Sequence, residues 1–374
     1  MNRLSAENTP APSAGVSAAK GDYSSPSGEV RRGAVGAGAA FSIILLLPVI
    51  VVLLVANLMI GTVDIPVGSV VSILMGSSSE SEIWQNIIFQ ARLPQALTAI
   101  AAGAGLAVSG LQMQTVFRNP LAGPSVLGIS NGSALGVAFV VLLSGRLGGV
   151  ALSRLGYLGD AAISVAAIVG ALAVMLLIVW VARRVSSSVT LLIIGVMIGY
   201  LANAIIGVLK FPSPEEDVKA FVVWGLGSFS RVSGDQMVLF VVLMAVLLPL
   251  SFLLVKPMNL LLLGDRYASN LGLNIRRSRM MVIVSAGVLV AIVTAYCGPI
   301  MFIGLAVPHL ARGIFRTSDH RVLMPATALC GAALALACNL IARMPGFEGA
   351  LPVNSVTSLV GAPVVAAVLF RKGR

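Results

Sequence analysis

The chain has 374 residues, of which 57% are hydrophobic and only 10% are charged, and its mean hydropathy is +0.98. A soluble domain carries about 25% charged residues, so the composition excludes a water-soluble globular protein. It predicts an all-α protein that crosses a lipid membrane several times. Membrane proteins carry an excess of Lys and Arg in their cytoplasmic loops. This excess accounts for the formal net charge of +11, so no nucleic-acid partner is expected.

The first 33 residues differ from the rest of the chain. They are rich in Ala, Ser, Gly and Pro and contain few large apolar side chains, so we expect a disordered tail over 1–33. The apolar run that starts near Ala34 is far longer than the core of a cleavable signal. It predicts a first span that stays as an anchor, and one transmembrane domain over 34–374.

Apolar windows long enough to cross a bilayer, about 20 residues each, recur along that domain. They predict ten helices, near 38–60, 94–115, 124–144, 161–182, 189–208, 236–255, 280–297, 300–316, 323–342 and 353–370. The division between the seventh and the eighth helix rests on Gly298-Pro299, because residues 280–308 hold no charge. The alternative is one long, bent helix there, and nine helices in all.

Basic residues are distributed unevenly over the predicted loops. With the N-terminus in the cytoplasm, 18 of the 25 Lys and Arg residues fall on the cytoplasmic side, in agreement with the positive-inside rule. Most acidic residues then fall outside, among them Glu80, Glu216 and Glu348. We therefore expect both termini in the cytoplasm.

Groups that drive ion-coupled transport are absent from the middle of the predicted spans. No Asp, Glu or Lys lies there, whereas ion-coupled transporters usually carry such groups. The chain also has no G-x-x-x-x-G-K-[ST] loop and no His-Glu-x-x-His motif, and its three cysteines fit no metal motif. The sequence predicts a transporter without cofactor or metal, not an enzyme, that depends on an ATPase from another polypeptide.

Two distant blocks carry a family resemblance. Residues 92–135 read RLPQALTAIAAGAGLAVSGLQMQTVFRNPLAGPSVLGISNGSAL, and residues 298–321 read GPIMFIGLAVPHLARGIFRTSDHR, followed by LPVNSVTSLVGAP at 351–363. These blocks resemble the FecCD-like permeases of type II ABC importers for iron-siderophore, haem and cobalamin. The resemblance implies a cobalamin-importer-permease-like bundle in a bacterial inner membrane. It also implies a homodimer that works with two ATPase subunits and one periplasmic substrate-binding protein.

The loop between the sixth and seventh predicted helices resembles the family's coupling segment, which docks on the ATPase. The residues that match are Gly264, Asp265, Arg266, Ala268, Leu271 and Gly272. A short helix ended by Gly272 would present a compact knob to the ATPase. Arg266 and Ser269 stand where relatives carry a second acid and an arginine, which leaves the polar pairing of the segment open. The alternative is an ordinary loop.

Two arginines at the opposite face, Arg92 and Arg343, match family positions that look outward and receive carboxylates of the binding protein. Bidentate pairing with carboxylates favours Arg over Lys. Gln95 stands where the family often has a further arginine, so docking would rest on fewer charges. The alternative is that both arginines only reach the membrane interface as snorkelling side chains.

A gate and a pore are implied around the fifth predicted helix. The turn that contains Ser187, Ser188 and Val189 precedes it, where the family places its cytoplasmic gate, and Tyr200 and Asn203 are polar residues within it. The resemblance implies that two copies pair and that the path runs between their fifth helices. The alternative is a plain loop and a helix with satisfied polar groups.

The cargo is the least specified property of the chain. The run FEGALPVN at 347–354 resembles iron-type members, so an iron chelate, siderophore or haem, is the leading expectation. Cobalamin import by the same alternating-access mechanism is the alternative. A secondary transporter is the alternative from another class.

Overall fold

The computed structural model describes residues 32–76, 81–144, 157–185, 187–232, 234–344 and 351–372. Within these ranges the protein is helical and contains no strand, so the all-α prediction is confirmed. The predicted tail lies almost wholly outside the described residues, and the first helix begins at Arg32. Part of the run that suggested an iron-type cargo, residues 347–350, also lies outside them.

Within the described ranges, ten helices overlap the ten predicted spans. They are α1 (Arg32–Met59), α4 (Leu93–Phe117), α5 (Ile129–Ser144), α6 (Tyr157–Ala182), α7 (Ser188–Lys210), α9 (Gly234–Phe252), α12 (Ile275–Cys297), α13 (Ile303–Phe315), α14 (His320–Ala342) and α15 (Val353–Lys372). Six helical segments of the described chain are long and apolar enough to cross a membrane, and four further apolar helices are shorter.

The break that separates the seventh and eighth predicted helices is present. The helix α12 ends at Cys297, Gly298 follows with φ +75°, and α13 begins at Ile303. A left-handed residue of this kind ends a helix, and glycine adopts it without a steric cost. The alternative with one bent helix and nine helices is therefore wrong.

Short helices that the sequence reading missed lie between the long ones. They are α2 (Val67–Leu74), α3 (Glu82–Asn86), η1 (Ile87–Arg92, a π-helical turn), η2 (Pro124–Leu127), α8 (Glu215–Gly225), η4 (Phe229–Arg231), α10 (Val255–Leu262) and α11 (Asp265–Asn270). The second predicted span does not start at residue 94, because helix runs without interruption from Glu82 to Phe117.

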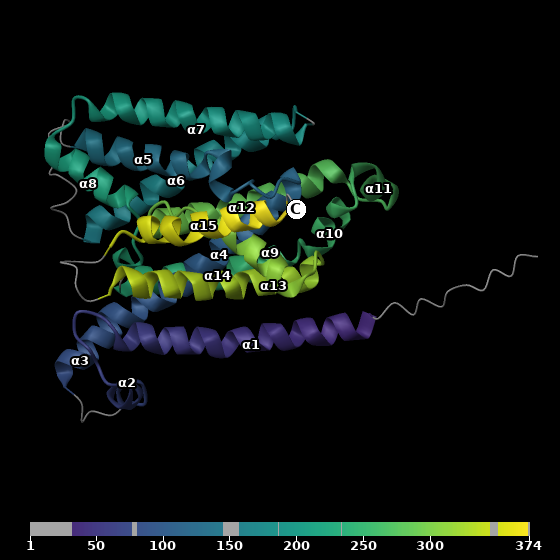
Figure 1. The fold of residues 1–374 in the computed structure, drawn as a ribbon. Helices are drawn as coiled ribbons and strands as arrows, with labels where there is room; N and C mark the ends of the chain where they lie inside the picture. Colours follow the sequence, from purple (N-terminus) through teal and green to yellow (C-terminus); the bar gives the residue numbers. More distant parts are fainter. Residues whose placement is uncertain are drawn as a thin grey trace, which may run out of the picture.

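The long helices form a bundle with α4 inside it, α1 along one side and α7 along the opposite side (Figure 1). Every residue of α4 from Ala101 to Phe117 is buried, and this helix packs against α9, α12, α13 and α14. Small residues permit the close approach, as expected for helices packed in lipid. A Cβ added to Gly103 would lie 2.3 Å from the carbonyl oxygen of Gly331 on α14.

The contact between α4 and α13 is closer still and gives a prediction. A Cβ at Gly110 would lie 1.7 Å from the carbonyl oxygen of Gly304, so Gly110→Ala must separate the two helices. We expect a loss of about 1–3 kcal/mol in stability, measured as a lower Tm in detergent. Gly313→Ala on α13 is the matched control, because its added Cβ meets nothing within 4 Å. Equal Tm values for the two variants would contradict the packing assignment.

Candidate functional site

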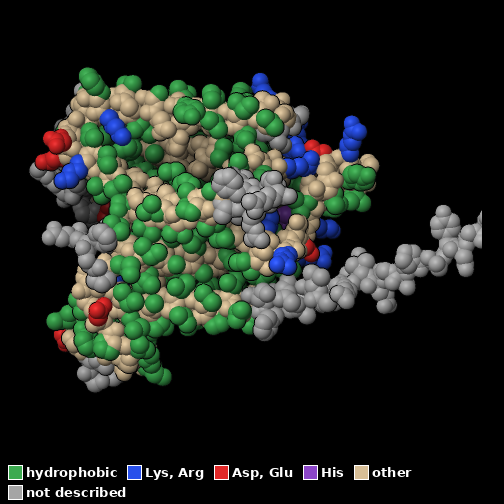
Figure 2. Space-filling view, viewed as in Figure 1, with side chains coloured by type: hydrophobic (Ala, Val, Ile, Leu, Met, Phe, Trp, Pro, Cys, Tyr) green, Lys and Arg blue, Asp and Glu red, His purple; other side chains and the backbone are tan. Residues whose placement is uncertain are grey.

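Basic side chains gather at the end of the bundle that carries α10 and α11, and acidic side chains appear at the opposite end, near α3 and α8 (Figure 2). The basic end holds the segment expected to couple to an ATPase and the turn expected to form a gate. The opposite end holds the two arginines expected to receive a binding protein.

The expected coupling segment, residues 264–272, contains α11 and begins at Gly264, whose φ of +102° turns the chain from α10 into α11. After α11, Gly272 adopts φ +82°, and the backbone N–H of Leu273 donates to the carbonyl of Ala268 at 3.0 Å. A glycine in this conformation closes a helix and satisfies its last carbonyl groups. The short helix ended by Gly272, which the sequence predicts, is present.

The side chains of α11 divide into an inward and an outward set. Ala268 is fully buried, whereas Leu271 is 61% exposed and Tyr267 is 71% exposed. Arg266 is also exposed. Tyr267 on α11 and Leu271, the residue directly after it, thus give the segment two large, exposed side chains that form an outward-facing knob.

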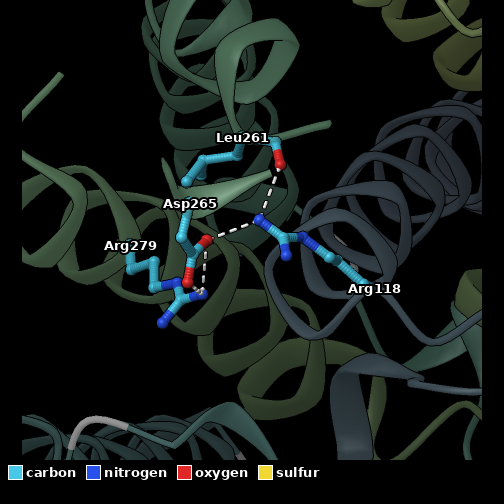
Figure 3. Close-up of polar contacts among 4 residues, drawn as sticks. All are labelled: Arg118, Leu261, Asp265 and Arg279. Atoms are coloured by element: carbon cyan, nitrogen blue, oxygen red, sulfur yellow. Dashed lines mark hydrogen bonds and ion pairs between the residues drawn. The ribbon is translucent and has the colours of Figure 1, made fainter. Parts of the chain in front are cut away.

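Asp265 ties the coupling segment to the bundle through two arginines that the sequence reading did not assign to it (Figure 3). Arg118, directly after α4, approaches the Asp265 carboxylate to 2.5 Å and also donates to the carbonyl of Leu261 at 3.0 Å. Arg279 on α12 reaches both carboxylate oxygens, at 2.7 and 3.0 Å. We call Arg118, Asp265 and Arg279 the ionic cluster. Asp265 thus pairs with arginines outside the coupling segment. Arg266 and Ser269, the two positions at which this sequence departs from the family pattern, are not its partners in the cluster.

The turn before α7 lies next to this cluster. A pocket of about 420 Å³ is lined by Ser187 from the turn, by Asp265, and by Arg276 and Arg279 from α12. Arg276 also donates to the carbonyl of Arg183, which precedes the turn. The first turns of α12 therefore contact the expected coupling segment through Arg279 and, through Arg276, the stretch directly after α6 that leads to the expected gate.

The residues expected to form a gate and a pore lie at the start and on the outer face of α7. Ser187 caps the helix, because its hydroxyl accepts a hydrogen bond from the Thr190 N–H at 3.3 Å. Ser188 is the first residue of α7, and its side chain lies outside the described part. Val189, Tyr200 and Asn203 are exposed. They belong to a mostly apolar face that also includes Ile193, Met197 and Val208.

A small polar recess accompanies this face of α7. It has a volume of about 190 Å³ and is lined by Tyr200 and Asn203 together with Ser125 and Asn131 from η2 and α5. Hydroxyl and amide groups without a net charge thus lie beside an apolar helix face. No charged side chain is among the described residues that line the recess.

At the opposite end, Arg92 is placed differently from the outward-facing expectation. Its side chain is only 2% exposed. The guanidinium donates to the carbonyls of Leu58 at 2.6 Å and Met59 at 2.7 Å, and also to that of Val63. These are carbonyl groups at and just beyond the end of α1, which a cation stabilises. Arg92 thus holds the end of α1 against the helix that runs into α4.

Arg343 lies beside Arg92 but is more accessible. Both guanidinium groups flank Gly61, since a Cβ there would lie 2.9 Å from Arg92 Nη2 and 3.1 Å from Arg343 Nη2. Among the described residues, Arg343 makes one hydrogen bond, of 3.5 Å, to the carbonyl of Asn57. Burial, with a further contribution from the charge of Arg92, lowers the pKa of Arg343 to about 10. It remains a cation at neutral pH.

Arg343 also lines a polar pocket of about 240 Å³ at this end. The other polar residues of the pocket are Thr62, Gln95, Ser228, Ser230 and Asn339. The pocket therefore brings together Arg343 and Gln95, the position at which the family often has a further arginine. One guanidinium with amide and hydroxyl groups around it can accept one carboxylate from a partner.

Comparison with known proteins gives these sites a family context. Residues 49–371 match the FecCD transport family. The vitamin B12 import system permease protein BtuC of Escherichia coli O6:H1 is 37% identical over 287 residues, which cover 77% of this chain and 84% of that protein. The protein of the same name from Klebsiella pneumoniae subsp. pneumoniae is 38% identical over 291 residues, or 78% of this chain and 84% of that protein.

A solved structure agrees with the fold. It is described as an inward-facing conformation of a metal-chelate type ABC transporter, and it superposes with a TM-score of 0.77 at 28% sequence identity. The alignment covers 89% of this chain and 99% of that chain. The likeness therefore extends over almost the whole length of both proteins.

Proposed function

Because the chain belongs to the FecCD transport family, we propose that it carries cobalamin across the bacterial inner membrane. It is the permease subunit of an ABC importer and not an enzyme, and a separate subunit hydrolyses ATP. Family membership excludes the secondary-transporter alternative. The observation that carries the cargo proposal is the 37–38% identity to vitamin B12 permeases over most of both chains. It supports the cobalamin alternative better than the iron-chelate expectation.

An iron chelate is the second candidate cargo. The solved relative described as a metal-chelate type transporter supports it, at the lower identity of 28%. Siderophores and haem share with cobalamin a large size and mixed polarity. The permease alone does not separate these cargoes, because its described recess contains no group specific to one of them.

The partners follow from the same family. We expect two ATPase subunits at the coupling segments, one periplasmic binding protein at the opposite end, and a second copy of this chain. The exposed face of α7, from Val189 through Tyr200 to Val208, is the surface on which the second copy would pack. The basic end that holds the coupling segment would face the cytoplasm, as the positive-inside rule favours, with both termini on that side.

The contacts at the basic end suggest how ATP binding moves the gate. Force from the ATPase on Leu271 and Tyr267 would displace α11. The ionic cluster would pass that displacement to α4 and α12. The hydrogen bond from Arg276 to the carbonyl of Arg183 would then pass it from α12 to the stretch between α6 and the turn before α7. Alternating access then becomes a shift between two arrangements of packed helices, which the ATPase biases.

This route predicts a specific defect in Asp265→Asn. The ATPase should still bind, because the knob is intact, but cargo uptake per ATP hydrolysed should fall by up to about tenfold. Each half-exposed ion pair is worth up to ~1 kcal/mol, which limits the effect. Arg266→Gln is the matched control, since Arg266 is an exposed cation on the same helix outside the cluster. Uptake and hydrolysis would be measured together in proteoliposomes, and equal coupling in the two variants would contradict the route.

At the opposite end we propose that Arg343, with Gln95 beside it, receives a carboxylate of the binding protein. Arg92 contributes indirectly, by holding the end of α1 that carries Gly61 and Thr62. Arg343→Glu should slow capture of the binding protein. The wild-type on-rate should fall with added salt, because the Debye length shrinks from about 10 Å at 0.1 M to about 3 Å at 1 M.

The cargo is tested on the cognate binding protein. Purified with its natural ligand, it should show the absorption bands of a corrin, which differ from those of haem and of ferric siderophores. A haem or ferric-siderophore spectrum would replace cobalamin by the second candidate and leave the importer assignment intact. A binding protein that fails to associate with this permease would not inform on its cargo, so association is measured first.

A further inference from the structure

A large apolar groove lies on the outside of the bundle, between the end of α9, α10 and the first half of α12. Its volume is about 980 Å³. Leucines from α9 and α10 line it on one side, and methionines, valines and a leucine from α12 line it on the other. Leu271, Gly272 and Leu273, which follow α11, line it as well. The span of α9 is mostly uncovered, with only 17% of it buried inside the protein. The groove therefore faces the surroundings of the bundle and not its core.

One end of the groove is basic. Lys256, near the start of α10, and Arg277, near the start of α12, both line it and are both exposed. No carboxylate is among the lining residues. Within the described residues, neither side chain forms an ion pair with an acidic side chain. Two cations thus lie at the groove's mouth without a counter-ion from the described protein.

The length of the groove matches one leaflet of a bilayer. Its α12 wall extends from Arg277 to Leu289, and a helix rises about 1.5 Å per residue, which gives roughly 18 Å. The hydrocarbon core of a bilayer is about 30 Å thick, so one leaflet contributes about 15 Å. Lys256 and Arg277 lie in the first turns of α10 and α12, and α10 lies at the basic end of the bundle (Figure 1). The apolar lining continues along α12 to Leu289.

We propose that this groove binds one anionic phospholipid, such as phosphatidylglycerol, from the leaflet at the basic end. Arg277 would hold the phosphate through paired N–H donors, Lys256 would add a point charge, and an acyl chain would lie along the leucines of α9. Basic pockets between helices at this depth suit anionic headgroups. The proposal does not depend on the cargo. Leu271 and Gly272 line both this groove and the knob expected to meet the ATPase, so the test below includes the ATPase.

The test is native mass spectrometry of the full chain, titrated with phosphatidylglycerol or with phosphatidylcholine of the same acyl chains. The wild type should retain phosphatidylglycerol in preference, by about tenfold or more, since each basic residue near a membrane surface adds roughly 1 kcal/mol. Lys256→Gln with Arg277→Gln should lose this preference. Arg316→Gln, which removes an exposed cation at the same end but outside the groove, should keep it.

A second variant tests the apolar part separately. Val284→Phe would fill the groove without changing a charge, and it should lower retention of both lipids at the site. Unchanged preference in the double glutamine variant would overturn the proposal, as would displacement of the lipid by millimolar glycerol phosphate. Loss of the lipid when purified ATPase binds would assign the groove to the ATPase interface instead and would also overturn it.

Discussion

Leu271→Asp should abolish co-purification of the ATPase while the permease stays folded in the membrane. Leu271 is 61% exposed at the end of α11, so the substitution perturbs no core packing. In the complex, however, it would place a carboxylate in an apolar contact and leave it desolvated without a partner. Loss of one central contact residue at an interface costs about 2 kcal/mol or more, so the ATPase should dissociate at least ~30-fold more readily.

The measurement is the ratio of ATPase to permease after affinity purification, with Leu271→Met as control. Methionine keeps an apolar side chain of similar volume and should retain the ATPase. Gly272→Pro tests the same knob through the backbone. It removes the N–H that donates to the Ser269 carbonyl at 2.9 Å and replaces a φ of +82° by one fixed near −65°. Retained ATPase in both Leu271→Asp and Gly272→Pro would show that α11 is not the contact.

Arg92→Ala should destabilise the permease itself. The substitution leaves the carbonyls of Leu58, Met59 and Val63 without their shared donor and removes a side chain that is only 2% exposed. Hydrogen bonds to charged groups are worth about 1.5–3 kcal/mol each. Because such losses are not additive, we expect a total of about 3–5 kcal/mol, of the size found when a buried polar network is broken.

Thermal unfolding in detergent measures this effect, and Arg343→Ala is the control. Arg343 makes one bond of 3.5 Å within the described part of the chain, so its loss should lower the Tm little while it slows capture of the binding protein. Arg92→Lys should be intermediate, since an ammonium lacks the planar fork that serves several carbonyls at once. If Arg92→Ala and Arg343→Ala have the same Tm but both slow capture, Arg92 belongs to the docking surface and not to the end of α1.

The sequence predicts the long helices well, because each is an apolar window of nearly bilayer length. The break at Gly298 follows from one residue that favours a left-handed turn. The short helices α8, α10 and α11 are harder to predict, since they bury few side chains and carry charges that read as loops. The end of α11 at Gly272 is the exception. Glycine readily adopts the positive φ found at a helix end, so its place in the sequence indicates where the helix stops.

The structure buries Arg92, whereas the sequence leads us to expect an outward-facing side chain, and the reason is local. Arg-Leu-Pro resembles a helix start, where proline is well placed, so the arginine appears to lie at an exposed rim. In the protein, α3 and η1 continue directly into α4. Arg92 therefore lies within a continuous helical segment, turned towards the end of α1. Its carbonyl partners are 29 to 34 residues away in sequence, and no local pattern identifies them.

The ionic cluster shows the same limit at the basic end. Asp265 is separated from Arg118 by 147 residues and from Arg279 by 14. The sequence identifies Arg118 and Arg279 only as cytoplasmic charges that fit the positive-inside rule. That α4 ends beside α11 is a consequence of tertiary packing. The sequence therefore predicts which segments form the candidate site. It does not predict which residues of different segments pair, because that pairing depends on the fold.

Uptake of radiolabelled cobalamin into proteoliposomes tests the central claim most directly. The permease would be reconstituted with its ATPase and with cobalamin-loaded binding protein, and uptake would be compared with ATP, without ATP, and with an ATPase that cannot hydrolyse it. The account predicts accumulation only with ATP and active ATPase, and its loss in Leu271→Asp. Uptake that follows an ion gradient and ignores ATP, or ATP-driven uptake of a ferric chelate with none of cobalamin, would contradict it.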